Sequence, residues 1–251
     1  MSKLGLGVDC SPAVDRVHAA MTTSVVRMAD ARWHIEIRPD RGGRITSLRL
    51  DGDELLEQGI GVDQPTADGF VEAGAFGWDE MVPNLEPTAT LPDHGEAWRL
   101  PWQVLRRAPV EVSMRCRGKL VPWELTRSIY LRDGSVIVVY TYRNAGKAPH
   151  NAYWCAHPLF RYEPGMSVSV DIPRPQEGRS AKVFLPRGSV DRIRLGRVEL
   201  GWDASVTPDV AIWVCNGDLG GYRQIAVEPA TASPMLEPGA SLRWGLRIRP
   251  I

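Results

Sequence analysis

The chain has 251 residues, 43% of them hydrophobic, with 30 basic and 30 acidic side chains. This composition is typical of a globular protein and excludes a disordered chain or a fibre. The balanced charge provides no basic stripe that could follow a phosphate backbone, so we expect no nucleic acid as a partner. The longest apolar runs, such as SVIVVY at 135–140, fall far short of the roughly 20 residues of a bilayer span, so no membrane partner is expected either.

Residues 1–22 are expected to form a flexible N-terminal extension, with Met21 as an alternative start of translation. They lack the basic region followed by a continuous apolar run that indicates a signal peptide. The cysteines are widely spaced, with no CxxC pair; they are Cys10, Cys116, Cys155 and Cys215. This usage favours reduced thiols and a cytoplasmic location.

Most of the remaining chain alternates apolar and polar residues between turn sequences, which predicts strands. In chain order these segments are WHIEIRP (33–39), ITSLRL (45–50), WQVLRRA (102–108), VEVSMRCRG (110–118), WELTRSIYLRDG (123–134), SVIVVYTYRNAG (135–146), NAYWCAHPLF (151–160), MSVSVDIP (166–173), RIRLGRVEL (192–200), VAIWVCNGD (210–218), YRQIAVEP (222–229) and SLRWGLRIRP (241–250). No long amphipathic helix is indicated. The fold class predicted is therefore all-β, a large antiparallel sandwich or barrel. No change in composition marks a linker, so residues 23–251 are expected to form one domain.

Residues 57–100 are the least strand-like part of the chain and are rich in aromatic and polar side chains. A long irregular segment in a compact domain is usually a functional loop. Within it, the turn PDHGE presents His94, which is either a ligand-facing side chain or a solvated loop histidine.

A second candidate histidine, His157, lies in YWCAHPLF directly before Pro158. Proline keeps the preceding residue out of helical geometry and removes a backbone donor, so we expect a strand end that presents the imidazole to a cleft. The alternative is a core histidine bonded to a carbonyl. The other histidines, His18, His34 and His150, are expected to be uninvolved.

A candidate carboxylate, Glu228, ends the apolar strand QIAVE and also precedes a proline. It is either exposed at the strand end or held in a cleft with a raised pKa, as a general base near neutral pH requires. His94, His157 and Glu228 could also form a metal site with two histidines and one carboxylate. They come from separate segments without local ligand spacing, so no metal is expected.

Tryptophans lie close in sequence to both candidate histidines: Trp78, Trp98, Trp102 and Trp154. Aromatic rings are good platforms for the apolar faces of sugars, while His, Arg and Asp side chains bind hydroxyls. The alternative is that these rings fill the space between two sheets, which is preferred for Trp102. The chain has no GxGxxG, Walker, HExxH or GxSxG motif, so no cofactor is expected.

Several segments together resemble the aldose 1-epimerase, or galactose mutarotase-like, family. They are IRPDRGGRITSLRLDGDELL (37–56), GWDEMVPN (77–84), PDHGEAWRLPW (92–102), NAYWCAHPLF (151–160), IAVEPAT (225–231) and LEPGASLRWGLRI (236–248). The resemblance covers about residues 30 to 251 and rests on the order and spacing of these segments. It implies the large antiparallel supersandwich of that family, with a sugar cleft on one concave face.

The resemblance also implies a reaction, the interconversion of sugar anomers without a cofactor. Glu228 matches the general base that deprotonates the anomeric hydroxyl, and His157 matches the general acid that protonates the ring oxygen. His94 matches a second histidine that binds the ring oxygen or a neighbouring hydroxyl.

The remaining substrate-binding assignments follow the same resemblance. Asp79 would replace the family's hydroxyl-binding aspartate, and Asp93 and Glu96 would bind hydroxyls or hold their loop. Trp98 or Trp78 would form a flat wall, with Trp154 also near the sugar, and Arg99 would bind a hydroxyl or a phosphate.

The expected partner is thus a small sugar or sugar phosphate, bound by a monomer or a homodimer. Two alternatives stay open at this point. One is a carbohydrate-binding protein with the same fold and no catalysis. The other is isomerase or lyase chemistry on an acidic sugar, for which Arg99 and Arg161 are the arginines to inspect.

Overall fold

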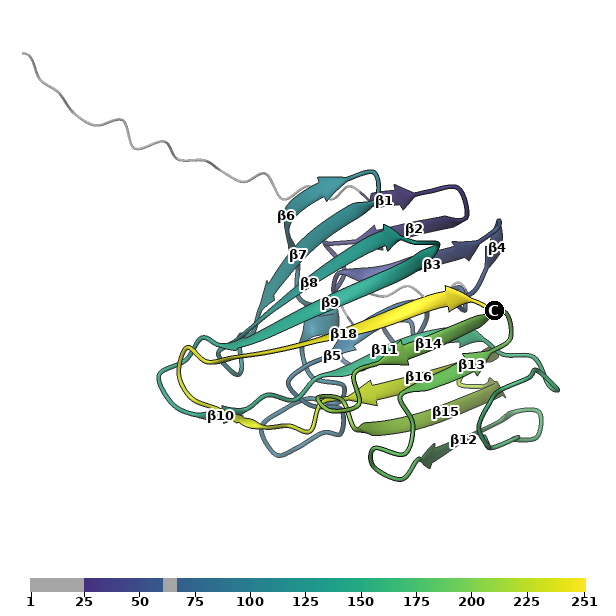
Figure 1. Cartoon of the computed structure of the whole chain (residues 1–251). Helices are drawn as coiled ribbons and strands as arrows, with labels where there is room; N and C mark the ends of the chain where they lie inside the picture. Colours follow the sequence, from purple (N-terminus) through teal and green to yellow (C-terminus); the bar gives the residue numbers. More distant parts are fainter. Residues whose placement is uncertain (1–24, 61–66) are drawn as a thin grey trace, which may run out of the picture.

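The computed structural model describes residues 25–60 and 67–251, and in them two large antiparallel sheets pack face to face (Figure 1). The nine-stranded sheet contains β1 (Val26–Ala29), β2 (Trp33–Arg38), β3 (Arg44–Leu50), β4 (Asp53–Glu54), β5 (Trp78–Met81), β11 (Cys155–Arg161), β16 (Tyr222–Ala230), β15 (Asp209–Asp218) and β12 (Arg179–Phe184). The seven-stranded sheet contains β13 (Arg192–Leu195), β14 (Val198–Trp202), β18 (Ser241–Pro250), β9 (Ser135–Asn144), β8 (Trp123–Arg132), β7 (Glu111–Arg117) and β6 (Gln103–Ala108). A small third sheet pairs β10 (His150–Asn151) with β17 (Met235–Leu236).

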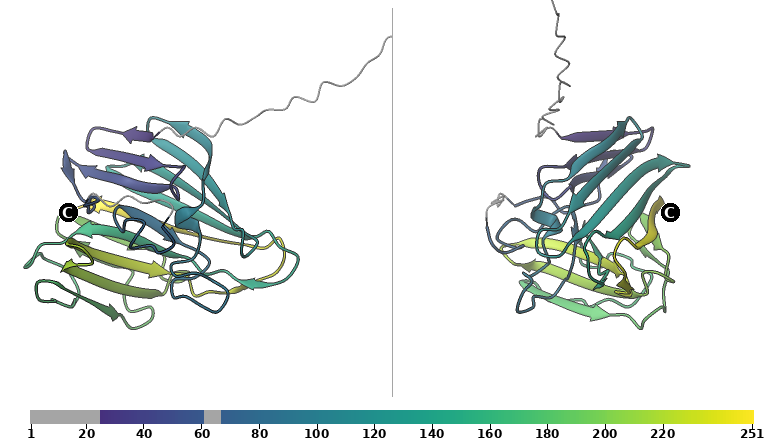
Figure 2. Two further views of the ribbon diagram at one scale, coloured as in Figure 1. Left: turned by 180° about the vertical axis from the view of Figure 1, so that it is seen from behind. Right: turned by 90° about the vertical axis from the view of Figure 1, so that its left-hand side faces the viewer.

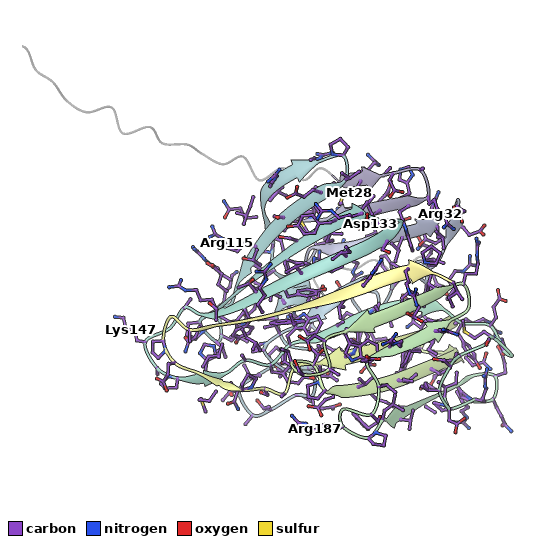
Figure 3. The ribbon with its side chains drawn as sticks, viewed as in Figure 1. Met28, Arg32, Arg115, Asp133, Lys147 and Arg187 are labelled. Atoms are coloured by element: carbon purple, nitrogen blue, oxygen red, sulfur yellow. The ribbon has the colours of Figure 1, made fainter. Side chains whose placement is uncertain are left out.

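The fold class predicted from the alternating pattern is confirmed. Strand β8, for example, buries every second residue from Trp123 to Leu131, and these side chains enter the core between the two sheets. The opposite side of such a strand faces outward, as expected for an antiparallel sheet with one solvated face. Charged side chains such as Lys147 and Arg187 accordingly lie at the periphery of the molecule (Figure 3). The prediction for residues 1–22 falls outside the described residues.

Three of the predicted strand segments differ in the structure, and β1, β4, β5, β12 and β17 lie outside all of the predicted segments. MSVSVDIP forms no strand, because its pairing is limited to a single bridge from Val168 to Leu195. The run 192–200 is a hairpin, with β13 and β14 joined at Gly196 (φ 54°). Finally, β11 does not end at His157: the strand continues through Pro158 to Arg161.

A buried polar group lies inside the sandwich. Glu80 of β5 accepts hydrogen bonds from Arg127 Nη1 (2.8 Å) and Tyr140 OH (2.8 Å) through Oε1, and from Trp154 Nε1 (2.7 Å) through Oε2. Both charged side chains are fully buried. This group ties β5 of one sheet to β8 and β9 of the other, and burying it is tolerable because each charge is matched.

The face of the nine-stranded sheet that points away from the core carries a second, smaller apolar cluster. It contains Cys155 and Leu159 of β11 and Ala226 and Ala230 of β16, while the alternate residues of both strands enter the main core. Parts of the segments before and after β5 pack over this face, with Phe70 and Trp98 in the cluster, as the view from behind shows (Figure 2). Residues 79, 157 and 228 are two positions away from members of this cluster along the same strands, so their side chains point to the same face. We call this face of the sheet the site face.

Candidate functional site

A transverse row of ionisable side chains crosses the site face over four neighbouring strands. The pairing Ile45↔Trp78 brings Arg44 beside Asp79, and Asp79 pairs directly with His157. The register between β11 and β16 then sets Glu228 opposite His157. The order along the row is Arg44, Asp79, His157 and Glu228.

Prolines interrupt the backbone ladder at this row. β11 and β16 pair at Cys155↔Ala230. The positions that follow are unpaired, and the pairing resumes at Leu159↔Ala226. Pro158 and Pro229 lie in the interval, and neither can donate a backbone hydrogen bond. The two His-Pro and Glu-Pro dipeptides that the sequence offers as separate signals therefore meet side by side in the sheet.

Glu228 is almost completely buried and has two charged or ionisable neighbours. Lys182 Nζ of β12 lies 2.8 Å from Oε2, and His157 Nε2 lies 3.8 Å from Oε1. Burial raises the pKa of the carboxyl group, and the cation of Lys182 opposes that shift. Within the described residues Oε1 is buried and accepts no hydrogen bond, so this oxygen of the carboxylate has no protein donor.

His157 is 5% exposed. Desolvation lowers its pKa well below 6.5, with further lowering from His94 and the nearby cations, so the imidazole is neutral at pH 7. The ring of Phe70, from the segment over the site face, packs edge-on against it with centroids 5.2 Å apart. Phe70 therefore keeps water from one side of His157.

His94 reaches the same place from its loop. Its ring stacks on Phe70 at 4.7 Å between centroids and lies edge-on to His157 at 5.4 Å. Nδ1 is 2.7 Å from the carboxylate of Asp93, which favours a proton on that nitrogen and leaves Nε2 for other partners. The backbone at His94 is left-handed (φ 59°), a conformation that non-glycine residues adopt mainly where their surroundings impose it.

The turn after His94 depends on Gly95. Its φ is 66°, and a Cβ there would lie 2.3 Å from the carbonyl oxygen of Val82. Glycine alone fits this close approach, which holds the loop against the end of β5.

Asp79 forms a buried ion pair with Arg44, with Nη2 2.9 Å from Oδ2 and Nε donating to Oδ1 at 3.1 Å. Burial raises the pKa of Asp79, and Arg44 opposes the shift. The pair closes the row on the side of His157 opposite Glu228. Asp79 therefore lies beside the candidate catalytic residues. Its partner Arg44 was not identified from the sequence.

The other predicted binding residues divide between the site face and the interior. Trp98, from the short 3-10 helix η1 (Ala97–Arg99), contacts Phe70 edge-on at 5.3 Å, and Arg99 stacks over the Trp98 ring at 4.4 Å. Glu96 is buried and accepts hydrogen bonds from the backbone amides of Lys119 and Leu120, so it holds the β7–β8 hairpin to the loop.

Trp78 and Trp154 lie inside the sandwich, on the opposite side of the sheet from His157. Both are fully buried in the main core, and neither ring is accessible to a ligand. Trp102 is also in this core, as preferred from the sequence. Adjacent residues of a strand point to opposite faces, so closeness in sequence to a site residue does not place a ring in the site.

Besides Arg44, sequence reasoning missed four residues of the site: Phe70, Tyr153, Lys182 and Phe184. Lys182 and Phe184 belong to β12, an edge strand with no clear apolar alternation. Phe184 is 70% exposed, and it pairs with Ala211 of β15, which in turn pairs with Glu228. The small side chain of Ala211 leaves an open space between Phe184 and Glu228.

This space is a cavity of about 320 Å³ that Glu228, Cys155, Tyr153, Phe184 and Ala211 help to line. A neighbouring cavity of about 510 Å³ shares Leu85, Tyr153 and Phe184 with it. Both volumes lie in the range of roughly 300 to 1,000 Å³ that small-molecule sites occupy. Glu228 is therefore reached along the side of Tyr153 and Phe184, while Phe70 covers the histidines.

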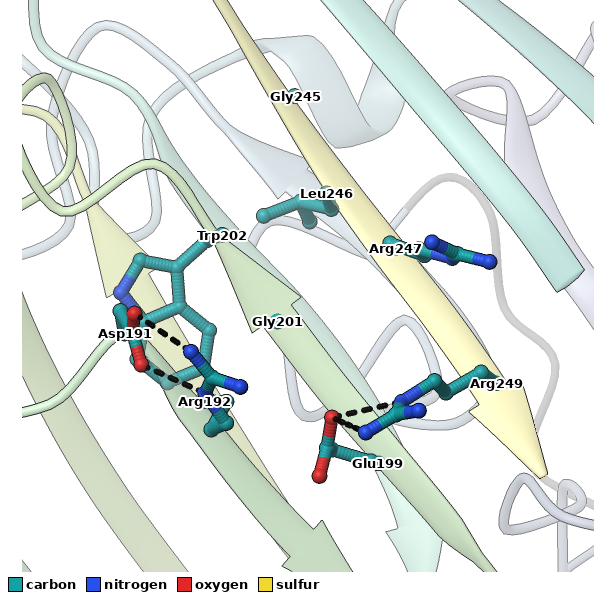
Figure 4. A pocket seen from close by; sticks show the side chains of 9 residues that line it. All are labelled: Asp191, Arg192, Glu199, Gly201, Trp202, Gly245, Leu246, Arg247 and Arg249. Carbon is teal, nitrogen blue, oxygen red and sulfur yellow. Dashed lines mark hydrogen bonds and ion pairs between the residues drawn. The ribbon is translucent and has the colours of Figure 1, made fainter. Parts of the chain in front are cut away.

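A further cavity of about 540 Å³ lies on the outer face of the seven-stranded sheet, between β13, β14 and β18 (Figure 4). Four of its charged side chains form two ion pairs, Asp191 with Arg192 at 2.8 Å and Glu199 with Arg249 at 2.7 Å, and Arg247 donates to the hydroxyl of Ser135. No histidine or nucleophilic side chain lines it. The site face, by contrast, carries two histidines and a buried carboxylate, so it is the better candidate for a catalytic site.

Residues 25–60 and 67–251 lack two kinds of feature. In that part of the chain no helix has the length and hydropathy of a membrane span. The same residues contain no group of three or more His, Cys, Asp or Glu side chains arranged to hold a metal ion.

Comparison with known proteins gives a likeness in fold. No protein-family model matches the chain, and no curated protein matches it either. A solved structure from Escherichia coli, whose description proposes an aldose 1-epimerase, superposes with a TM-score of 0.73 at 13% identity, covering 91% of this chain and 99% of the other. A protein from Synechocystis matches with a TM-score of 0.73 at 16% identity over 100% and 99% of the two chains. A galactose mutarotase-like protein from Lactobacillus casei matches with a TM-score of 0.70 at 15% identity over 91% and 100%. The chain thus has the fold of the galactose mutarotase-like proteins.

Proposed function

We propose that this protein interconverts the anomers of a reducing sugar by general acid and base catalysis. The observation that carries the proposal is the pair His157 and Glu228, with Nε2 and Oε1 3.8 Å apart on neighbouring strands. The anomeric hydroxyl and the ring oxygen of a cyclic sugar share one carbon, so a base and an acid acting on them must also be neighbours. The fold likeness to proteins described as aldose 1-epimerases supports the same reaction class by analogy.

In the proposed reaction, Glu228 takes the proton of the anomeric hydroxyl and His157 gives a proton to the ring oxygen. The C1–O bond of the ring breaks and the open-chain aldehyde forms. Rotation about C1–C2 followed by closure on the other face yields the other anomer, with the two residues exchanging roles. Only protons are transferred, so the reaction calls for no cofactor.

The electrostatics of the pair support this assignment. Burial raises the pKa of Glu228, which makes the ionised carboxylate a stronger base. Burial lowers the pKa of His157, so the protonated imidazole that gives the proton is a minority form at pH 7, but it is a stronger acid than an ordinary imidazolium. Both shifts bring the proton affinities of base and acid closer together, which lowers the cost of passing a proton through the sugar.

The surrounding residues have supporting roles in this proposal. His94, oriented by Asp93, would bind the ring oxygen or a neighbouring hydroxyl. Asp79 and Arg44 would bind hydroxyls at the other end of the row or hold His157 in place. Trp98 with Arg99 would close the side of the site next to Phe70.

A second candidate is sugar binding without turnover, and two contacts favour it. Lys182 neutralises Glu228 at 2.8 Å, and the ring of Phe70 covers both histidines. A protein of this kind would bind a sugar tightly and leave the rate of anomeric exchange at its background value.

Magnetisation-exchange NMR between α and β anomers separates the two candidates. Glucose, galactose, arabinose and their 6-phosphates are measured with wild-type protein and with Glu228→Gln. The proposal expects faster exchange for at least one sugar, reduced on the order of 100- to 10,000-fold in the variant. Glu237→Gln makes the same chemical change at an exposed turn and serves as the control. Exchange that persists in a folded Glu228→Gln variant would refute the assigned base.

A further inference from the structure

The cavity that Glu228 lines adjoins the larger cavity, and we call the two together the groove. The smaller one has Glu228 in its lining, and the larger one extends from it toward the end of β10, with Leu91, Val121, His150 and Asn151 among its lining residues. Leu85, Tyr153 and Phe184 border both. The accessible space next to the candidate base is therefore elongated, with room beyond a first ligand group.

An aromatic side chain stands at the junction of this groove. Phe184 is 70% exposed although it lies in a strand, and its ring borders both halves. Tyr153 borders the same junction. Exposed aromatic rings stabilise a saccharide by packing on the apolar face of its ring, so this position suits a sugar unit adjacent to the one at Glu228.

The charge of the groove selects against anions. Three carboxylates line it, those of Glu86, Asp209 and Glu228, and no lysine or arginine is among the lining residues of either cavity. Two cations lie beside the lining, and each is held by one of these carboxylates. Lys182 is 2.8 Å from Glu228, and Arg187 is 3.6 Å from Asp209. A phosphate or carboxylate on the sugar would face net negative charge without a free cation.

We propose that the substrate is an uncharged reducing oligosaccharide, with its reducing-end ring at Glu228 and its next ring against Phe184 in the groove. This inference rests on the proposed function and names its substrate class. The inference excludes sugar phosphates, which the sequence had allowed as substrates with Arg99 as the phosphate-binding residue. Arg99 stacks on Trp98 and is not part of the groove lining.

The test compares the anomeric exchange of cellobiose, maltose and lactose with that of glucose, galactose and glucose 6-phosphate. We expect kcat/KM for at least one disaccharide to exceed that of its reducing-end monosaccharide about tenfold, the effect of one aromatic contact. In Phe184→Ala this ratio should fall to about one, and Phe184→Tyr should restore it. Leu105→Ala, which removes another exposed apolar side chain on the distant strand β6, should leave the ratio unchanged.

Three outcomes would overturn the inference: a monosaccharide preferred over every disaccharide, glucose 6-phosphate preferred over all, or an unchanged ratio in Phe184→Ala. Calorimetric binding of the same sugars separates this failure from that of the proposed function. If wild-type protein binds a disaccharide more tightly than glucose in a Phe184-dependent way but exchanges no anomers, the groove assignment stands and the catalytic proposal fails. If monosaccharides exchange and Phe184→Ala changes nothing, the reverse holds.

Discussion

His157 Nε2 lies 3.8 Å from Glu228 Oε1. The two residues are on adjacent strands, at positions where Pro158 and Pro229 interrupt the backbone pairing. The distance is too long for a hydrogen bond and short enough for one sugar carbon to present two oxygens to both groups. The two groups are buried on the same face of the sheet, and their contacts lead to the following predictions.

Protonation of His157 should oppose folding. Burial lowers its pKa below the ordinary value of 6.5, so the unfolded chain binds more protons than the folded protein once the pH falls below 6.5. The free energy of unfolding should therefore decrease as pH is lowered from 6.5 toward the folded-state pKa, with a slope from this group of at most about 1.4 kcal/mol per pH unit.

Chemical denaturation between pH 5 and 7 measures this slope in wild-type protein and in His157→Gln. The variant should show a smaller loss of stability on acidification. His34→Gln, at an exposed position on β2, is the control and should follow the wild type. Equal slopes in all three proteins would contradict the assigned burial of His157.

Lys182 should set the pH at which Glu228 ionises. Its cation lowers the pKa that burial raises, so Lys182→Met should raise the pKa of Glu228 further. Because the base must be ionised, the acid limb of kcat/KM for anomeric exchange should move to higher pH. Lys182→Arg should keep the limb near its wild-type position, and Lys147→Met, an exposed lysine in a loop, should not move it. A limb that stays in place in Lys182→Met would show that the ion pair does not control the base.

Phe70 should shield both histidines from water. Its ring contacts His94 and His157, so Phe70→Ala should raise the pKa of His157 toward 6.5 by reducing its desolvation. NMR titration of the histidine ring signals measures the pKa, and acylation of the histidines followed by mass spectrometry measures their access. Phe76→Ala removes a loop ring that packs on Arg44 instead, and it should leave His94 acylation at the wild-type rate. An unchanged pKa of His157 in Phe70→Ala would rule out this shielding.

Arg127 should be essential for stability. Arg127→Met leaves the fully buried carboxylate of Glu80 without its cation, and breaking such a pair costs about 3–5 kcal/mol of unfolding free energy. The double variant Arg127→Met with Glu80→Gln removes both charges and should regain part of that loss. Arg192→Met, which breaks an exposed pair with Asp191, should change stability little. Denaturant titration compares the variants; a cost for Arg127→Met no larger than for Arg192→Met would contradict the prediction.

The sequence was sufficient for the strands that keep a regular alternation, because one buried face and one solvated face leave a period of two in the residues themselves. β7 and β8 follow that rule, and the fold class follows from the number of alternating segments. β5 does not: it contains Asp79 and Glu80, both fully buried, and the cations of Arg44 and Arg127 on other strands help to make those carboxylates tolerable in a sheet. Such a strand cannot be predicted locally, because its stability comes from partners distant in the chain.

The site shows the same division. The dipeptides His157-Pro158 and Glu228-Pro229 marked two unusual strand positions, and the resemblance to mutarotases assigned them roles. Only the pairing of β11 with β16 brought them together, and only the edge strand β12 added Lys182 and Phe184. The tertiary fold divided the tryptophans near the histidines in sequence: Trp98, in the 3-10 helix η1, lies on the site face, and Trp78 and Trp154 lie in the core. Sequence spacing carries the period of each strand, but the register between strands depends on the packing of the whole sandwich.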